Sequence, residues 1–304
     1  MHYLVTGGAG FIGSHITRLL VKENHTVTVI DNLSSGKSQN ISDLIDKINF
    51  YEYDVLDYEK LKKIAGKMDG IFHKAALVSV SESFERSDEF FDVNVKGSEK
   101  IFKIALDNGI KVVFASSSSV YGNVSKIPIS EDFPKNSINP YAKTKIEGEE
   151  IAKNYVKKGA HIIGLRYFNV FGKGQSIAYA GVITKFMEKI SKKEDPIIFG
   201  DGSQVRDFVH VEDVARANLM VMQSDVSNGF FNIGTGESIS IKELAQKIID
   251  ISKLKLNSRF EKPLKGDIEM SEADISLVRE SIGWEPKITL DDWLRKIVPE
   301  LLVS

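Results

Sequence analysis

The 304-residue sequence predicts an α/β protein with a doubly wound parallel sheet and a smaller C-terminal α/β domain. Three observations lead to this fold class. In the first half, short apolar runs alternate with helix-length amphipathic stretches, which is typical of βαβ units. Residues 112–115 are continuously apolar, as expected of a strand buried on both faces of a parallel sheet. After about residue 168 the alternation loosens, and Gly, Pro and Asp become more frequent.

The elements follow one another in that alternating order. We expect strands at 2–6, 26–31, 49–54, 70–73, 111–116 and 161–167, and helices near 11–23, 57–66, 88–108 and 139–158. We therefore predict a first domain at 1–167 and a second at 168–304, with a segment of about 207–235 returning to the first.

Composition excludes several classes of protein. The chain is 42% hydrophobic and 27% charged, which is typical of a globular protein. A formal charge of −2 gives no reason to expect nucleic acid or an anionic membrane as a partner. No apolar run approaches the ~20 residues of a membrane span, and the N-terminus lacks an apolar targeting segment, so we expect a cytoplasmic protein. The absence of cysteine excludes disulfides and thiolate ligands, and we expect no metal.

A glycine-rich turn connects the first strand to the first helix. It reads Gly7-Gly8-Ala9-Gly10-Phe11-Ile12-Gly13. Glycines allow a tight turn and let backbone N–H groups approach a pyrophosphate at the helix N-terminus. In this strand–turn–helix context the turn predicts a dinucleotide site of the Rossmann type.

Two acidic residues end the next two strands. Asp31 lies eighteen residues after Gly13, where a carboxylate accepts hydrogen bonds from the adenosine ribose and repels a 2′-phosphate. This favours NAD over NADP, although Asp31 could instead serve only as a turn residue. Asp54 ends the third strand and could bind the adenine edge or simply cap the strand; both alternatives stay open.

Tyr141 and Lys145 lie at the start of a predicted helix, one turn apart on the same face. A tyrosine, with an ordinary pKa of ~10, is a poor base at neutral pH. A nearby ammonium and a positive nicotinamide favour the phenolate, so we expect the pKa of Tyr141 to be lowered towards neutrality. The pair predicts a general base for an alcohol.

Four serines, Ser116 to Ser119, end the strand at 111–116 and precede Val120-Tyr121-Gly122. The carboxyl ends of strands line the ligand crevice of a doubly wound sheet. Serine hydroxyls at this position could hydrogen-bond a reacting alcohol.

Together these motifs resemble the extended short-chain dehydrogenase/reductase family, most closely its UDP-glucose 4-epimerase branch. The resemblance covers nearly the whole chain. It rests on the motifs above and on further ones at 31–33, 73–76, 94–97, 166–172 and 200–211.

The resemblance implies a role for each of several residues. Tyr141 would be the base, Lys145 would bind the nicotinamide ribose, and Ser117 would bond the reacting hydroxyl. The remaining implied NAD contacts are Gly7, Gly10, Phe11, Ile12, Gly13, Asp31, Asn32, Asp54, Val55, Ala75, Asn94 and Phe168. Substrate contacts are Ser117, Ser119, Tyr141, Asn169, Val182, Arg206, Asp267 and Ser271, with Arg206 on the diphosphate, since its planar fork matches phosphate oxygens.

The serine stretch separates the branches of the family. Related dehydratases carry an acidic pair immediately before the Val-Tyr-Gly, and decarboxylases carry a glutamate directly before the valine. Here Ser118 and Ser119 occupy those positions. We therefore expect NAD-dependent 4-epimerisation of a UDP-hexose through a transient 4-keto sugar. The alternatives are a UDP-glucuronate 4-epimerase, another nucleotide-sugar enzyme of the family, or a non-catalytic NAD-binding sensor.

The chain departs from the family at two positions. An arginine that usually grips the diphosphate is replaced by Leu264, and Lys265 or Lys262 could substitute for it. Lys74 stands where hexose epimerases often have an aromatic residue.

Two further expectations concern specificity and assembly. Ser271 stands where a tyrosine would restrict the pocket, so we expect UDP-N-acetylglucosamine to be accepted beside UDP-glucose. The helices near 88–108 and 139–158 resemble those of an intermolecular four-helix bundle, which predicts a C2 homodimer. Ile101, Phe102, Ile104 and Ala105 on the first helix could form that bundle or pack on the sheet.

Overall fold

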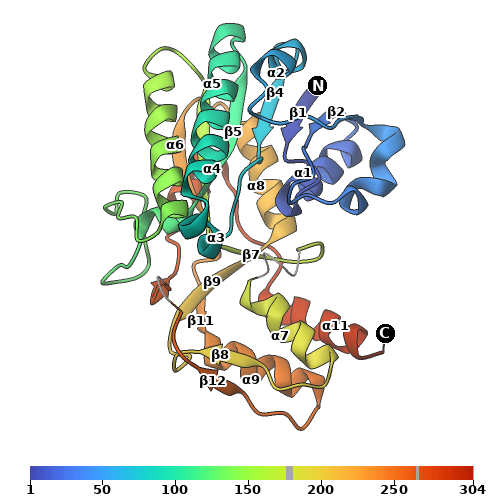
Figure 1. The fold of residues 1–304 in the computed structure, drawn as a ribbon, viewed down its shortest axis with the longest axis vertical. Coiled ribbons are helices and arrows are strands. Elements are labelled where there is room, and N and C mark those ends of the chain that lie inside the picture. The colour runs from blue at the N-terminus through green and yellow to red at the C-terminus, as the bar shows by residue number, and fades with distance from the viewer. Residues whose placement is uncertain (176–180, 265–266, 304) are drawn as a thin grey trace.

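A computed structural model describes residues 1–175, 181–264 and 267–303 (Figure 1). Its largest element is a parallel sheet in which seven of the described strands run in the order β10-β6-β5-β4-β1-β2-β3. The strands are β1 (His2–Thr6), β2 (Thr26–Ile30), β3 (Asn49–Tyr51), β4 (Gly70–His73), β5 (Lys111–Ser117), β6 (Ile162–Tyr167) and β10 (Gly229–Ile233). Strand order reverses between β1 and β4. Ligands of such sheets bind in the crevice outside this switch point.

Helices cover both faces of this sheet, which confirms the predicted doubly wound fold (Figure 1). One face carries α1 (Phe11–Lys22), α8 (Val211–Gln223) and the 3₁₀ segment η1 (Ser38–Lys47). The other carries α2 (Tyr58–Ala65), α5 (Gly97–Asn108) and α6 (Pro140–Val156). Leu4 and Val5 of β1 are both fully buried but belong to cores on opposite faces. This two-sided burial accounts for the continuous apolar runs.

The expected helix at 88–108 consists of three segments. These are α4 (Ser87–Phe91), the π-helical segment η2 (Asp92–Lys96) and α5. A π segment is a local widening that is often found beside functional sites. The short α3 (Val80–Glu85) and 3₁₀ segment η3 (Ser118–Tyr121), like η1, were not predicted.

The four apolar residues considered for a dimer contact point inward. Ile101, Phe102, Ile104 and Ala105 are at most 1% exposed and pack in the core between α5 and the sheet. The alternative of packing on the sheet is therefore the correct one for these residues. Any contact between chains must use the outer faces of the helices.

A smaller unit lies below the sheet in Figure 1. Its strands are β7 (Asn169–Phe171), β8 (Ile197–Phe199), β9 (Val205–His210), β11 (Ser238–Ser240), β12 (Arg259–Glu261) and β13 (Met270–Ser271). Its helices are α7 (Val182–Ser191), α9 (Ile241–Ser252) and α11 (Leu290–Val303), which share one apolar core. The chain returns to the large sheet in α8 and β10, and α10 (Ser276–Ile282) packs beside β10.

Asp207 ties the smaller unit to the returning chain. It is fully buried on β9, and its carboxylate accepts hydrogen bonds from Thr235, Gly236 and Ala273 at 2.7–3.1 Å. Burial raises the pKa of Asp207 to about 6, and these donors oppose the rise. Because every partner donates, they match the charged carboxylate rather than the acid.

None of the described helices has the length and apolar character needed to cross a bilayer. No cluster of His, Asp and Glu that could hold a metal ion occurs in the described part of the chain.

Candidate active site

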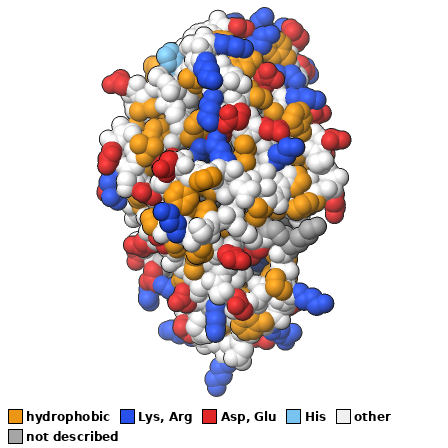
Figure 2. Space-filling model, turned by 90° about the vertical axis from the view of Figure 1, so that its left-hand side faces the viewer, with side chains coloured by type: hydrophobic (Ala, Val, Ile, Leu, Met, Phe, Trp, Pro, Cys, Tyr) orange, Lys and Arg blue, Asp and Glu red, His pale blue; other side chains and the backbone are white. Residues whose placement is uncertain are grey.

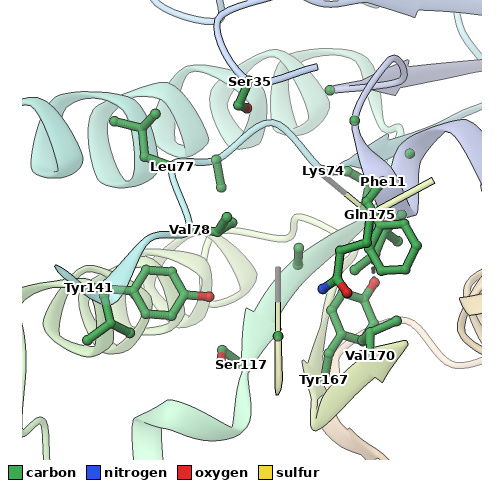
Figure 3. Close-up of a pocket in the computed structure, with 18 of the residues that line it drawn as sticks. Phe11, Ser35, Lys74, Leu77, Val78, Ser117, Tyr141, Tyr167, Val170 and Gln175 are labelled. Carbon is green, nitrogen blue, oxygen red and sulfur yellow. Dashed lines mark hydrogen bonds between the residues drawn. The ribbon is translucent and has the colours of Figure 1, made fainter. Parts of the chain in front are cut away.

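A cavity of about 730 Å³ opens beyond the carboxyl ends of β1 and β4, at the point where strand order reverses. Its walls come from the glycine turn, the ends of β2, β4 and β5, the start of α6, and residues of the smaller unit. Figure 3 shows the Tyr141 hydroxyl pointing into this space, with Ser117 beside it. The cavity therefore joins the predicted cofactor site to the predicted catalytic pair.

The glycine turn leaves no room for side chains at two positions. A Cβ on Gly13 would lie 2.0 Å from the Gly7 carbonyl oxygen, and one on Gly7 would lie 2.6 Å from the Ala75 nitrogen. Gly7 also adopts a left-handed φ of 68°, which favours glycine. No side chain caps the first turn of α1, so its N–H groups can face a pyrophosphate.

Asp31 lies at the end of β2 and lines the cavity. Its carboxylate accepts hydrogen bonds from the N–H groups of Ala9, at 2.9 Å, and Leu33, at 2.8 Å. Burial raises the pKa of Asp31, and these backbone bonds oppose the rise. Asp31 thus holds the glycine turn in place, and its ribose contact remains a prediction.

The adenine end of the predicted site also lines the cavity. Asn32 donates to one oxygen of Asp54 at 2.8 Å, and the other oxygen of Asp54 accepts from Leu56 N–H at 2.7 Å. Asp54 therefore stabilises its own turn while it and Val55 face the cavity. Capping and adenine binding are compatible alternatives at this residue.

Tyr141 and Lys145 are placed by the start of α6. The Asn139 side chain accepts from Ala142 N–H at 2.8 Å and caps the helix, and Pro140 occupies its first turn. The Lys145 ammonium donates to the Ala115 carbonyl of β5 at 3.0 Å and lies 5.7 Å from the Tyr141 ring centroid. One helix thus presents both groups to the end of β5.

Burial sets the direction of the pKa shifts in this cluster. It raises the pKa of Tyr141, since burial disfavours the phenolate, and the Ser117 hydroxyl only partly offsets the rise. The expected lowering of the Tyr141 pKa includes the positive charge of a bound nicotinamide, and it stays a prediction. Burial also lowers the pKa of Lys145 to about 8, against the attraction of Glu149.

Lys74 forms hydrogen bonds to groups on two neighbouring strands. Its ammonium donates to the Val113 carbonyl and to the Tyr167 hydroxyl, each at 3.0 Å, and Tyr167 in turn donates to Asn218 at 3.0 Å. Burial lowers the pKa of Lys74 well below its usual range, and Lys145 lowers it further. Lys74 thus connects the end of β4 to β5 and β6 on the cavity wall.

Most of the other predicted residues also face the cavity. Phe11, Ile12, Ala75, Phe168, Asn169, Val182, Arg206 and Asp267 line it. Asn94 lies in η2, where it bonds both backbone groups of Leu77 and the Thr144 hydroxyl at 2.8–3.0 Å. It therefore supports the wall at Leu77.

Ser119 and Ser271 are placed differently. Both are buried, at 8% and 4% exposure, and neither is among the residues that form the described cavity wall. Ser271 pairs with Arg206 in the sheet of the smaller unit, whereas the Ser119 hydroxyl has no hydrogen-bond partner among the described residues. Their substrate contacts stay predictions.

Arg206 forms an ion pair with Asp267 at 2.6 Å and not with its neighbour Asp207. Leu264 lines the cavity at the position of the usual arginine. Of the proposed substitutes, Lys265 lies outside the described residues, and Lys262 is exposed and does not line the cavity. Lys185 of α7 does line it, although no sequence pattern had indicated this.

A model of the NAD dependent epimerase/dehydratase family matches residues 3–234. The chain belongs to this family. The resemblance to extended short-chain dehydrogenases is thereby confirmed, and so is NAD as the cofactor. The glycine positions, which exclude any Cβ, fit a closely approaching pyrophosphate.

Similar epimerase/dehydratase family members extend over the full chain. A Methanocaldococcus jannaschii protein with the provisional name UDP-glucose 4-epimerase is 40% identical, with 97% of this chain and 96% of that protein covered. A UDP-N-acetyl-alpha-D-glucosaminuronate decarboxylase of Bacillus cytotoxicus is 33% identical, with the same coverage.

Two solved structures of the family share the fold closely. UDP-glucose 4-epimerase of Thermotoga maritima with UDP-glucose is 36% identical, with a TM-score of 0.93 and 98% of each chain covered. UDP-N-acetylglucosamine 4-epimerase of Methanobrevibacter ruminantium, in complex with UDP-N-acetylmuramic acid, is 37% identical, with a TM-score of 0.93 and 99% and 98% covered. The protein is thus an NAD-dependent enzyme of the nucleotide-sugar epimerase/dehydratase type.

Proposed function

We propose that this protein inverts the configuration at C4 of a UDP-hexose, through a 4-keto sugar, and that it accepts both UDP-glucose and UDP-N-acetylglucosamine. The observation that supports this most is a tyrosine–lysine–serine cluster at the end of β5 with serines at 118 and 119. Dehydration and decarboxylation of a keto sugar call for a further acid or base. Epimerisation needs none.

The carboxylates that line the cavity already have partners. Asp31 and Asp54 bond backbone N–H groups, and Glu89 is paired with Arg86 at 2.6 Å. Asp267 is paired with Arg206. None of these four groups belongs to the strand end that carries Ser117, which favours simple epimerisation.

In the proposed reaction, bound NAD supplies a reversible acceptor for the C4 hydrogen. Tyr141 takes the proton of the 4-hydroxyl, and Ser117 donates a hydrogen bond to the developing carbonyl oxygen. Lys145 stabilises the Tyr141 phenolate through its positive charge. Once the keto sugar has turned its other face, Tyr141 returns the proton. Arg206 would hold the diphosphate during this rotation.

The test is a substrate panel read by NMR. Purified protein is mixed separately with UDP-glucose, UDP-N-acetylglucosamine and UDP-glucuronate. The proposal expects C4-inverted products from the first two, whereas a uronate epimerase would convert only the third. Loss of the carboxyl group from UDP-glucuronate would indicate the decarboxylase activity named for the Bacillus cytotoxicus relative. No turnover of any sugar, with NAD bound, would favour a sensor.

We also propose a C2 homodimer through the outer faces of α5 and α6. The side of the molecule that carries α6 shows charges of both signs interspersed with apolar side chains (Figure 2). Lys143 and Glu150 are exposed on α6, and Lys103 is exposed on α5. Such a surface supports a modest, polar contact rather than a large apolar one. Light scattering that shows only monomer at micromolar concentration would contradict the dimer.

A further inference from the structure

Glu149 of α6 is a fully buried carboxylate that the proposed reaction does not use. It accepts hydrogen bonds from the Ser116 hydroxyl, at 2.6 Å, and from Arg166 Nε, at 2.9 Å, and Nη2, at 2.8 Å. The Lys135 ammonium lies 2.5 Å from its second oxygen. Buried ionised carboxylates require such pairing, because their desolvation is costly.

Two partners of Glu149 lie on or next to the cavity wall. Ser116 lines the cavity and directly precedes Ser117 on β5, and Arg166 directly precedes the cavity residue Tyr167 on β6. Glu149 itself lies one turn after Lys145 and two turns after Tyr141, on the same face of α6. A single carboxylate therefore connects α6 and β5, which carry the catalytic cluster, with β6, which ends at the cavity wall.

The charge of Glu149 also acts on Lys145. Burial lowers the pKa of Lys145, and the attraction of Glu149 raises it. The other titratable groups that face Lys145 are Tyr141 on α6 and His73 and Lys74 at the end of β4. Burial lowers the pKa of His73 to about 3 and keeps it neutral. Of the titratable groups named here that face Lys145, Glu149 is the one that carries a negative charge.

We propose that Glu149 is a positioning residue for the catalytic cluster: it fixes Ser117 opposite Tyr141 and keeps Lys145 in its charged form. This rests on the proposed function, in which Tyr141 and Lys145 act on the 4-hydroxyl. A buried ion pair contributes little net stability compared with apolar residues of similar volume. The reason for a carboxylate here is accordingly its geometry and charge beside the cluster.

Two substitutions separate the two parts of this role. Ser116→Ala removes one hydrogen bond but leaves the charges of Glu149, Arg166 and Lys135 intact. It should lower kcat about ten-fold with KM unchanged, since a small displacement of a reacting group is costly. The pH at which activity is lost on the alkaline side should not move.

Glu149→Gln removes the negative charge while preserving the shape. Without that charge, Lys145 loses its proton at lower pH, so the alkaline fall in kcat should move down by about 0.5–1 pH unit. A purely structural role would lower the amount of active enzyme without moving this limb. If Glu149→Gln yields no folded protein, Ser116→Ala decides the positioning of Ser117, and a wild-type kcat in that variant still overturns the proposal.

Tyr121→Phe is the matched control. The Tyr121 hydroxyl accepts from Arg166 at 2.8 Å and donates to Asn232 of β10 at 2.7 Å, on the side of the network away from Ser116. The variant should lose thermal stability yet keep kcat within about two-fold and leave the alkaline limb in place.

Three results would overturn the proposal. The first is a wild-type kcat in Ser116→Ala, and the second is an unmoved alkaline limb in folded Glu149→Gln. The third is a change in kcat or in the alkaline limb of Tyr121→Phe as large as in those two variants. All of these variants are assayed with UDP-galactose, and Tyr141→Phe is assayed in parallel. Full activity in that variant would instead defeat the proposed function.

Discussion

The Lys145 ammonium lies over the Tyr141 ring, 5.7 Å from its centroid, and is held there by the Ala115 carbonyl. This relationship joins a helix residue to the strand that ends in Ser117. It places the positive charge of Lys145 beside the proposed base, Tyr141, although the two side chains are not hydrogen-bonded to each other.

Tyr141→Phe should lower kcat by ~10²–10⁴ because it removes the proton acceptor but retains the ring. Binding of UDP, measured by calorimetry, should change little. Tyr155→Phe on the same helix is the control, since its hydroxyl lies 3.5 Å from Glu99 and outside the cavity lining. More than a tenth of wild-type turnover in Tyr141→Phe would show that Tyr141 is not the base.

The pH profile should report Lys145. Burial lowers the pKa of Lys145 to about 8, and the proposed reaction uses the protonated form, which predominates below that pKa. Activity should therefore be retained below about pH 8 and fall as the pH rises through it. Steady-state rates measured from below pH 8 up to pH 10 give the alkaline fall in activity. A profile that is flat up to pH 10 would mean that the Lys145 charge is dispensable.

Asp31→Ala should weaken NAD binding by ~1.5–3 kcal/mol and NADP binding by less. The carboxylate accepts a backbone hydrogen bond from the glycine turn, and at the predicted ribose site it would also repel a 2′-phosphate. Fluorescence titration with the two cofactors gives the ratio, and thermal unfolding without cofactor controls for loosening of the turn. An unchanged NAD/NADP ratio would show that Asp31 does not face the ribose.

Arg206→Ala should weaken UDP binding by ~1.5–3 kcal/mol. Arg206 is the arginine among the described residues that line the cavity, and its guanidinium is the proposed partner of the diphosphate. Calorimetry with UDP measures the loss. Arg259→Ala, on an exposed ion pair with Asp195, is the matched control and should leave UDP binding unchanged. Equal UDP affinity in both variants would assign the diphosphate to another cation, with Lys185 the next to test.

Asp207→Asn should destabilise the fold by ~2–4 kcal/mol, since an amide would direct its NH₂ group at N–H donors. Urea denaturation gives the difference. Substitution of the exposed Asp201, Asp201→Asn, should shift the midpoint far less. Comparable shifts in the two variants would show that the Asp207 cluster does not hold the returning chain.

Local patterns predicted the parts of this protein that depend on local chemistry. The glycine turn and the Tyr141–Lys145 spacing each combine a helix or strand boundary with residues of special chemistry, so a single sequence is enough to find them. Six strands and four helical segments of the first half were predicted from the alternation of apolar runs and amphipathic stretches, although α3 was missed and 88–108 includes a π segment.

Long-range pairing was not predictable in this way. In the sequence, Glu149 is indistinguishable from the other polar residues of an amphipathic helix. Only the fold brings Ser116 and Arg166 into contact with it. Its i, i+4, i+8 spacing with Lys145 and Tyr141 was the one available signal. The short strands of the smaller unit span two to six residues, too few to establish a period.

The central claim is that the hydrogen at C4 leaves the sugar and returns to the same carbon on the opposite face. The most direct measurement uses UDP-galactose deuterated at C4, incubated with the enzyme in ordinary water, with the product examined by NMR. The account predicts UDP-glucose that retains deuterium at C4. Product that carries solvent hydrogen at C4, or no inversion at that carbon, would contradict it.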